Sequence, residues 1–167
     1  MDDWRIVPLG AGHDRQAFDC GQPALNTYLQ RQASQDVRRR IAQLFVATSA
    51  DPPNRIAGYY SLSAASFERR DLPAEAAKRL PHYPVPAALL GRLAIDQACQ
   101  GQGLGELLLL DALHRTLRAS AALAVHAMIV DAKDAAAARF YARYGFIAFP
   151  SQPLRLFLPM ETFARTA

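Results

Sequence analysis

The sequence predicts one domain of mixed α+β class, and three observations support this. The 167 residues are a usual length for one domain and are few for two. Hydrophobic residues make up 51% and charged residues 20%, which is the composition of a globular protein. Strand-like apolar segments are interspersed with segments of helical periodicity, and no repeat or low-complexity tract separates them. We therefore expect a single domain over residues 1–167.

The first half of the chain predicts three strands and one helix. A short apolar segment at 4–9 predicts the first strand. Proline is favoured in the first helical turn, and apolar residues recur at helical spacing after Pro23, so a helix is expected from there to about Ser34. Two further strands, at 44–47 and 56–67, are expected to form a hairpin around the turn Asp-Pro-Pro-Asn.

The second half begins with a small helix at 74–79 and a proline-rich extended arm. The nearly continuous apolar segment 87–96 then predicts a strand that is buried on both faces. A glycine-rich turn separates this strand from the most strongly amphipathic helix of the chain, at 106–119. The remaining predicted elements are a strand at 124–130, a helix at 135–144 capped by Asp134 and ended by Gly145, and strands at 146–149 and 155–158.

Composition also excludes several classes of protein. The net charge is +4, which is compatible with an anionic partner but does not require one. No stretch of about 18 apolar residues is present, and the N-terminal residues lack the features of a secretory signal, so a cytoplasmic protein without a membrane span is expected. Cys20 and Cys99 are expected to be reduced thiols, with a single disulfide as the alternative. The four histidines show no metal-ligand spacing, so no metal is expected.

The glycine-rich turn is the strongest functional signal in the sequence. Residues 100–105 read Gln-Gly-Gln-Gly-Leu-Gly and precede a helix whose free N–H groups and positive dipole end favour a phosphate. The P-loop pattern fails because no lysine follows the glycines, and the dinucleotide pattern fails because its third glycine is missing. A plain strand-to-helix turn, with glycines serving geometry alone, is the alternative.

The pattern that fits is (Arg or Gln)-x-x-Gly-x-(Gly or Ala), met by Gln100, Gly103 and Gly105. With the strand before it and the ending Phe140-Tyr141…Gly145-Phe146, the chain resembles the GNAT superfamily of N-acetyltransferases. The resemblance implies a mixed, mostly antiparallel central sheet, splayed between its fourth and fifth strands and flanked by helices. It also implies acetyl-CoA as cosubstrate. The residues it assigns to acetyl-CoA are Leu93, Ala94, Ile95, Gln100, Gly101, Gln102, Gly103, Leu104, Gly105, Glu106, Asp134, Ala137 and Phe140.

A narrower resemblance is to the GNAT toxins of type II toxin–antitoxin systems. It rests on the segments 20–25, 58–63, 80–86, 90–96 and 156–160. It implies acetylation of the amino group of aminoacyl-tRNA, a ribbon-helix-helix antitoxin as partner, and a homodimer. Two departures stand out: Gln102 replaces a frequent basic residue, and Asp134 stands where many members have asparagine and cannot donate a hydrogen bond when ionised.

The same resemblance assigns the chemistry to Tyr141 as the general acid that protonates the leaving CoA thiolate. Packing alone is the alternative for Tyr141, and Tyr144 is expected to pack beside Phe146. No general base is assigned, because an α-amine next to an ester is substantially neutral near pH 7. The backbone N–H near Leu93 or Ala94 is expected to polarise the thioester carbonyl.

Three basic clusters are candidates for contact with tRNA phosphates, although each could equally be a solvated surface. They are Arg38, Arg39 and Arg40; Arg69 and Arg70; and Lys78 and Arg79. Two other functions stay open on the sequence alone. One is a GNAT enzyme for a small amine or a protein N-terminus, and the other is a CoA-binding or RNA-binding module without catalysis. The sequence does not indicate which tRNA would be the acceptor.

Overall fold

The computed structural model describes residues 3–166, so residues 1, 2 and 167 of the predicted domain lie outside the described residues. The chain forms two compact units, one from residues 1–63 with 91–112 and the other from 64–90 with 113–167. The hydrogen-bonded strands, in their order across the sheet, are β1 (Arg5–Pro8), β2 (Gln43–Thr48), β3 (Gly58–Phe67), β4 (Val85–Ile95), β5 (Ala127–Asp131), β7 (Gln152–Pro159) and β6 (Ile147–Phe149). The β4–β5 pair is parallel, and the pairs β1–β2, β2–β3, β5–β7 and β6–β7 are antiparallel. The predicted mixed, mostly antiparallel sheet is therefore confirmed.

The first unit contains the N-terminal strands and helices. The helix predicted from Pro23 is confirmed. It contains one π-helical turn at Tyr28–Gln32 and ends at Arg38. The predicted strands at 4–9, 44–47 and 56–67 are also present, with ends shifted by one or two residues. The elements are β1 (Arg5–Pro8), α1 (Pro23–Thr27), η1 (Tyr28–Gln32), α2 (Ala33–Arg38), β2 (Gln43–Thr48) and β3 (Gly58–Phe67), which continues into the second unit.

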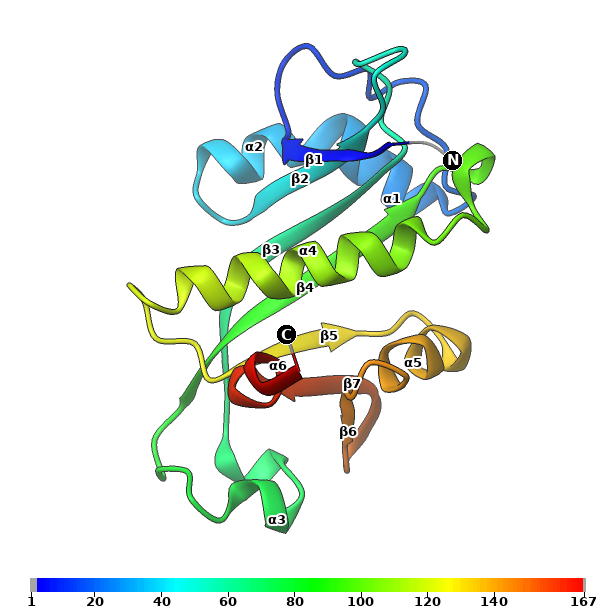
Figure 1. Ribbon diagram of the computed structural model, residues 1–167. Coiled ribbons are helices and arrows are strands. Elements are labelled where there is room, and N and C mark those ends of the chain that lie inside the picture. The colour runs from blue at the N-terminus through cyan, green and yellow to red at the C-terminus, as the bar shows by residue number, and fades with distance from the viewer. Residues whose placement is uncertain (1–2, 167) are drawn as a thin grey trace. The chain divides into compact units, whose positions relative to one another are not determined.

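Helices cover both faces of the strands in this unit. On one face, Leu44 and Val46 of β2 and Tyr59 of β3 pack against Leu29 and Ala33 of the helical segment. On the other face lies α4 (Leu104–Ala119, continuing into the second unit), drawn in front of the strands in Figure 1.

Contacts between β3 and α4 are close. The Tyr60 hydroxyl donates a 2.6 Å hydrogen bond to Asp111 of α4. A Cβ atom on Gly58 of β3 would lie 2.9 Å from Leu108, so only glycine allows this approach. Packing thus fixes the first turns of α4, and with them the loop that precedes the helix.

The second unit is built around β5 and β7. Its core contains Phe67, Val85, Ile129, Phe149 and Phe157. The elements are η2 (Arg69–Asp71), α3 (Ala74–Ala77), β4 (Val85–Ile95, continuing into the first unit), β5 (Ala127–Asp131), α5 (Ala135–Ala142), β6 (Ile147–Phe149), β7 (Gln152–Pro159) and α6 (Met160–Thr166).

Three details differ from the sequence-based expectations. The strand β4 is not buried on both faces, because most of its residues are partly exposed. Leu107 of α4 is 40% exposed, so this leucine lies outside the buried face of the helix that was predicted to be strongly amphipathic. Helix α6 was not predicted. It packs through Met160 and Phe163, and the ring of Phe163 lies 5.0 Å from that of His114.

Within residues 3–166, no helix is long and apolar enough to cross a bilayer, and no cluster of three or more His, Cys, Asp or Glu side chains could hold a metal ion. Cys20 and Cys99 are both buried, and no disulfide joins them in the described residues.

The stability of the second unit is expected to depend on His126. Burial lowers the pKa of this imidazole, and nearby Glu161 raises it by less. Since the folded-state pKa lies below the unfolded value near 6.5, stability is complete above about pH 6.5 and is lost as pH falls through the folded pKa. We expect His126→Gln to weaken the fall in unfolding free energy between about pH 7 and pH 5.

Urea denaturation at several pH values measures this effect. The matched control is His114→Gln, which removes another imidazole from the same unit. If the stability of His126→Gln fell with pH as steeply as that of the wild type, the attribution to His126 would be wrong.

Candidate active site

The predicted acetyl-CoA loop lies between β4 and α4 in the first unit. The chain leaves β4 at Ile95, makes the 3-10 turn η3 (Gln97–Cys99), and enters α4 at Leu104. Gly101 and Gly103 have φ angles of +80° and +79°, which side-chain-bearing residues rarely adopt. A Cβ atom at either position would meet nothing within 4 Å. The glycines are therefore required by conformation, and the space above them is open to a ligand.

This loop delivers backbone donors to the start of α4. The Leu107 N–H donates to the Gly103 carbonyl at 3.2 Å, which is the first bond of the helical ladder. The N–H groups before it have no carbonyl of the helix to bind, and they lie at the positive end of the helix dipole. The side chain of Glu106 is exposed in this first turn. In the absence of a ligand, its carboxylate stabilises the positive end of the helix dipole, but it repels an anionic ligand. An anion bound there must therefore be held by the backbone N–H groups.

Gln100 and Asp96 hold the loop in shape. The Gln100 side-chain amide donates to the carbonyl oxygens of Ile95 at 3.1 Å and Cys20 at 3.4 Å. The carboxylate of Asp96, only 7% exposed, accepts hydrogen bonds from the N–H groups of Ala98 and Asp19. The resemblance assigned Gln100 to the cofactor, but its amide N–H groups bind these two backbone carbonyls instead. Residues 101–103 are the exposed part of the loop.

The end of β4 is the other part of the predicted cofactor site in this unit. The register between β4 and β5 runs from Ala87–Ala127 to Leu90–Val130. Leu93, Ala94 and Ile95 lie beyond the last of these pairs. Ala94 is buried, and its two neighbours are partly exposed. These three residues form the end of β4, and only a short turn separates them from the loop that contains Gln100 and Glu106.

The helix α5 carries the predicted site residues of the second unit. Asp134 caps it, since its Oδ1 accepts the Ala137 N–H at 2.8 Å. Asp134 and Ala137 are thus brought together by the cap. At the other end Gly145 has a φ of +94°, its N–H donates to the Ala142 carbonyl, and the next N–H donates to that of Tyr141. This is the Schellman pattern, and it confirms the predicted start and glycine end of the helix.

Tyr141 is buried on this helix, with 7% of its surface exposed. Its ring contacts those of Phe140 and Phe146, at centroid distances of 5.2 and 5.6 Å. Burial raises the pKa of its phenol to about 12, so the group keeps its proton throughout the physiological range. Tyr144 lies 5.3 Å from Phe140, and the ring of Tyr141 lies beside that of Phe146. The expected packing of Tyr144 beside Phe146 stays a prediction.

The basic candidates divide between the two units. Arg38, Arg39 and Arg40 are exposed at the end of α2 in the first unit. Arg69 and Arg70 form η2 in the second unit, and Lys78 and Arg79 follow α3, with Lys78 paired to Glu75 at 3.1 Å.

Two arrangements escaped the sequence-based analysis. The guanidinium of Arg92 stacks 3.4 Å above the ring of Tyr28, whose hydroxyl donates to Asp36 at 2.7 Å. Burial and Asp36 together raise the pKa of Tyr28 to about 12. The second is a cavity beside Arg69, in which Arg69 meets His82. Both join residues that are far apart in sequence, and no local pattern indicates such contacts.

Comparison with known proteins decides the family. Residues 40–148, well over half of the chain, match the acetyltransferase (GNAT) domain. The chain belongs to the GNAT acetyltransferase family. The resemblance stated from Gln100, Gly103 and Gly105 and from the Phe140–Phe146 ending is thereby confirmed, together with the enzyme class that it implied.

Individual relatives of this GNAT chain are toxins. A tRNA-acetylating toxin of Mycobacterium tuberculosis is 36% identical over 148 residues, which are 89% of this chain and 87% of that protein. The structure of AtaT complexed with acetyl-methionyl-tRNAfMet is 34% identical, covers 98% of this chain and 99% of its own, and superposes with a TM-score of 0.91. A third is a tyrosine-to-phenylalanine variant of AtaT bound to the C-terminus of the antitoxin AtaR and acetyl-CoA. It is 32% identical, with coverages of 99% and 98% and a TM-score of 0.85.

Proposed function

We propose that this chain transfers acetyl from acetyl-CoA to the amino group of an aminoacyl-tRNA and acts as the toxin of a type II toxin–antitoxin system. One observation carries the proposal: a glycine loop shaped for a pyrophosphate opens α4 in a chain that is 36% identical to a tRNA-acetylating toxin. The proposal includes one domain over residues 1–167, a cytoplasmic homodimer, and neutralisation by a ribbon-helix-helix antitoxin.

Binding of acetyl-CoA is assigned first to residues of the first unit. The pyrophosphate would accept hydrogen bonds from the backbone N–H groups of residues 101–106, where the glycines permit close approach. The amide-rich arm of the cosubstrate would bind along Leu93 to Ile95 as an added strand, since β4 extends past its last registered pair with β5. In the second unit, the family resemblance also assigns Asp134, Ala137 and Phe140 of α5 to acetyl-CoA.

The reaction balances without a protein base. The neutral amine attacks the thioester carbonyl carbon, a carbon–nitrogen bond forms, and the carbon–sulfur bond breaks. The amine loses its extra proton to water, and the CoA thiolate takes the phenol proton of Tyr141, which water then replaces. A backbone N–H at Leu93 or Ala94 would stabilise the oxyanion formed on the carbonyl oxygen.

Charged tRNA as acceptor is supported by the relatives and by the exposed arginines of α2. Binding to phosphates releases counterions, so affinity falls linearly with salt on a double logarithmic scale. Replacing Arg38, Arg39 and Arg40 by alanine is expected to raise the KM for charged tRNA and to reduce that slope by about 2 to 3. Initial rates with labelled acetyl-CoA at several salt concentrations measure both quantities.

Two controls separate the alternatives. An amino acid methyl ester carries the same amine without phosphates, so its KM is expected to be equal in the wild type and the triple variant. Equal acetylation of this ester and of charged tRNA by the wild type, without salt dependence, would favour the small-amine enzyme. Binding of acetyl-CoA without acetylation of any amine would favour the non-catalytic module.

A further inference from the structure

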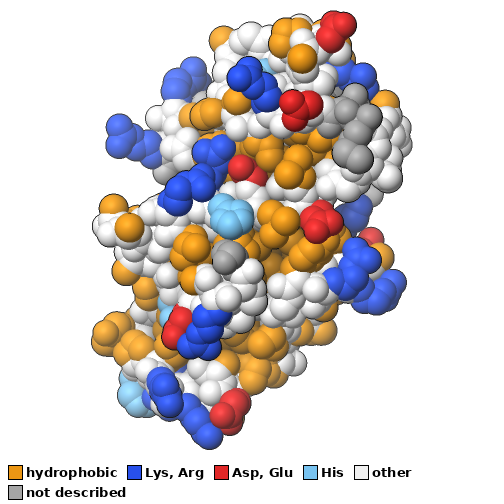
Figure 2. All heavy atoms as spheres, viewed as in Figure 1, with side chains coloured by type: hydrophobic (Ala, Val, Ile, Leu, Met, Phe, Trp, Pro, Cys, Tyr) orange, Lys and Arg blue, Asp and Glu red, His pale blue; other side chains and the backbone are white. Residues whose placement is uncertain are grey.

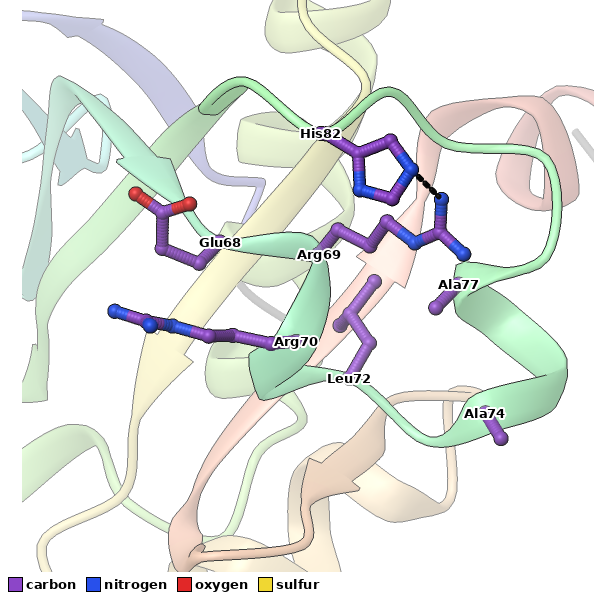
Figure 3. Close-up of a pocket in the computed structure, with 7 residues that line it drawn as sticks. All are labelled: Glu68, Arg69, Arg70, Leu72, Ala74, Ala77 and His82. Atoms are coloured by element: carbon purple, nitrogen blue, oxygen red, sulfur yellow. Dashed lines mark hydrogen bonds between the residues drawn. The ribbon is translucent and has the colours of Figure 1, made fainter.

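A basic cavity lies in the second unit, in the segment that joins β3 to β4. Its volume is about 580 Å³, within the range of about 300–1,000 Å³ typical of sites for small molecules or single nucleotides. Its polar lining comes from Glu68, Arg69, Arg70 and His82, and Leu72 and Ala77 supply apolar walls (Figure 3). We call it the arm pocket. None of the functions assigned so far uses its shape.

Two contacts hold the Arg69 side chain in the arm pocket and leave some of its N–H donors unused. Its Nη1 donates to the Leu80 carbonyl at 3.1 Å and lies 3.1 Å from Nε2 of His82. Since a guanidinium only donates, Nε2 is the acceptor of this bond. Three of the five guanidinium N–H donors have no partner within residues 3–166. Two ordered contacts therefore hold a cation whose remaining donors are available to an anion.

The charges around Arg69 leave the arm pocket cationic. Arg70 is exposed, extends to the opposite side of η2 in Figure 3, and has no hydrogen bond or ion pair in the described chain. Glu68 is the acidic residue of the lining, and its side chain accepts the Asp71 N–H in a reciprocal cap with the Asp71 carboxylate. The acid is thus engaged in closing η2, while both arginines keep free donors.

An exposed aromatic residue follows the pocket lining in the chain. Tyr83 comes directly after His82, which lines the arm pocket, and is 70% exposed. Figure 2 shows Lys and Arg side chains and a histidine gathered at the end of the view where α3 lies. Exposed aromatic rings beside arginines are the arrangement on which single-stranded nucleic acids stack their bases.

We infer that the arm pocket binds one nucleotide of the RNA acceptor, with its phosphate on Arg69, the neighbouring phosphate on Arg70 and its base on Tyr83. The inference rests on the proposed function, because it assigns a place to the RNA that the reaction requires. It also separates two kinds of contact: the arginines supply salt-dependent affinity, and Tyr83 supplies affinity that salt hardly changes.

Binding of fluorescently labelled, uncharged tRNA at several salt concentrations tests this assignment. Arg70→Gln is expected to reduce the slope of log affinity against log salt by about 0.7 to 0.9, the value for one phosphate contact. Tyr83→Leu is expected to weaken binding by about 5- to 100-fold with the slope unchanged, whereas Tyr83→Phe keeps the ring and stays close to the wild type. Both sites are exposed, so folding is preserved, and Arg118→Gln is the charge-matched control on α4.

The outcomes separate this inference from the proposed function. If Arg70→Gln and Tyr83→Leu bind tRNA as the wild type does while the wild type acetylates charged tRNA, the arm pocket assignment is wrong and the function stands. If the wild type neither binds tRNA nor acetylates it when charged, both fall. If the two variants keep tRNA binding but lose binding of the antitoxin, the pocket is a protein site and the inference is overturned.

Discussion

Replacing Tyr141 by phenylalanine is expected to lower the rate of acetyl transfer by about 10²- to 10⁴-fold, the usual contribution of a general acid. The affinity for acetyl-CoA and the thermal stability are expected to change little. The aromatic ring would keep its contacts with Phe140 and Phe146, and only the hydroxyl is removed. In cells, the variant is expected to lose the growth arrest that the wild type causes.

The raised pKa of Tyr141 makes this prediction sharper. With a pKa of about 12, the phenol is protonated at every pH near neutrality, so its own titration does not limit the rate there. The ratio of wild-type to variant rates is therefore expected to be constant between about pH 6 and pH 9. The acidic limb of both profiles should follow protonation of the acceptor amine.

Single-turnover rates with charged tRNA measure the effect, and Tyr144→Phe is the matched control one helical turn away. It removes the same atom from a ring that also contacts Phe140, and it is expected to keep most of the activity. A fully active Tyr141→Phe together with an inactive Tyr144→Phe would transfer the acid role to Tyr144.

The second large effect is expected from Gly103→Val. A β-branched residue at a φ of +79° is strained, and a relaxed backbone would turn the loop's N–H groups away from the pyrophosphate. The added side chain would also occupy the open space above the loop. We expect acetyl-CoA affinity to fall by at least about 10-fold, because several backbone hydrogen bonds to a charged group are lost.

Calorimetric titration with acetyl-CoA provides the measurement, and circular dichroism verifies that the variant is folded. Gly12→Val is the control, because Gly12 also has nothing within 4 Å of an added Cβ but does not have a positive φ. If a folded Gly103→Val bound acetyl-CoA as tightly as the wild type, the loop would not be the pyrophosphate site.

Most elements of this fold are predictable from local sequence. Periodicity predicts the strands β2 and β3 and the long helix α4, and cap residues predict the ends of α5. Helix α6 is missed because Met160 and Phe163 give too short an apolar pattern, and its burial depends on partners such as His114. The partial exposure of Leu89 and Leu93 in β4 is missed because apolar composition does not reveal which face lacks a covering layer.

Some residues of the candidate site are likewise predictable from local sequence, and others are not. Positions of the loop and Tyr141 are predictable because each lies in a contiguous motif. The arm pocket is not, since Arg69 and His82 are 13 residues apart and meet only after η2 and the arm have folded. The sequence also does not predict that the side-chain amide of Gln100 is hydrogen-bonded within the protein. Its acceptors are the carbonyl oxygens of Ile95 and of Cys20, which is distant in sequence.

The engagement of Gln100 explains what its position in the loop motif selects for. Glutamine and arginine differ in charge but share N–H groups at the end of a flexible stem, and both can donate to two carbonyl oxygens at once. Here those acceptors are Ile95 and Cys20. In this chain, the residue at the first position of the motif therefore serves as a hydrogen-bond donor to carbonyl oxygens, and it does not attract the phosphate by charge. A glutamate of nearly the same shape would place carboxylate oxygens against carbonyl oxygens. The resulting repulsion would disrupt the conformation of the loop even without a bound ligand.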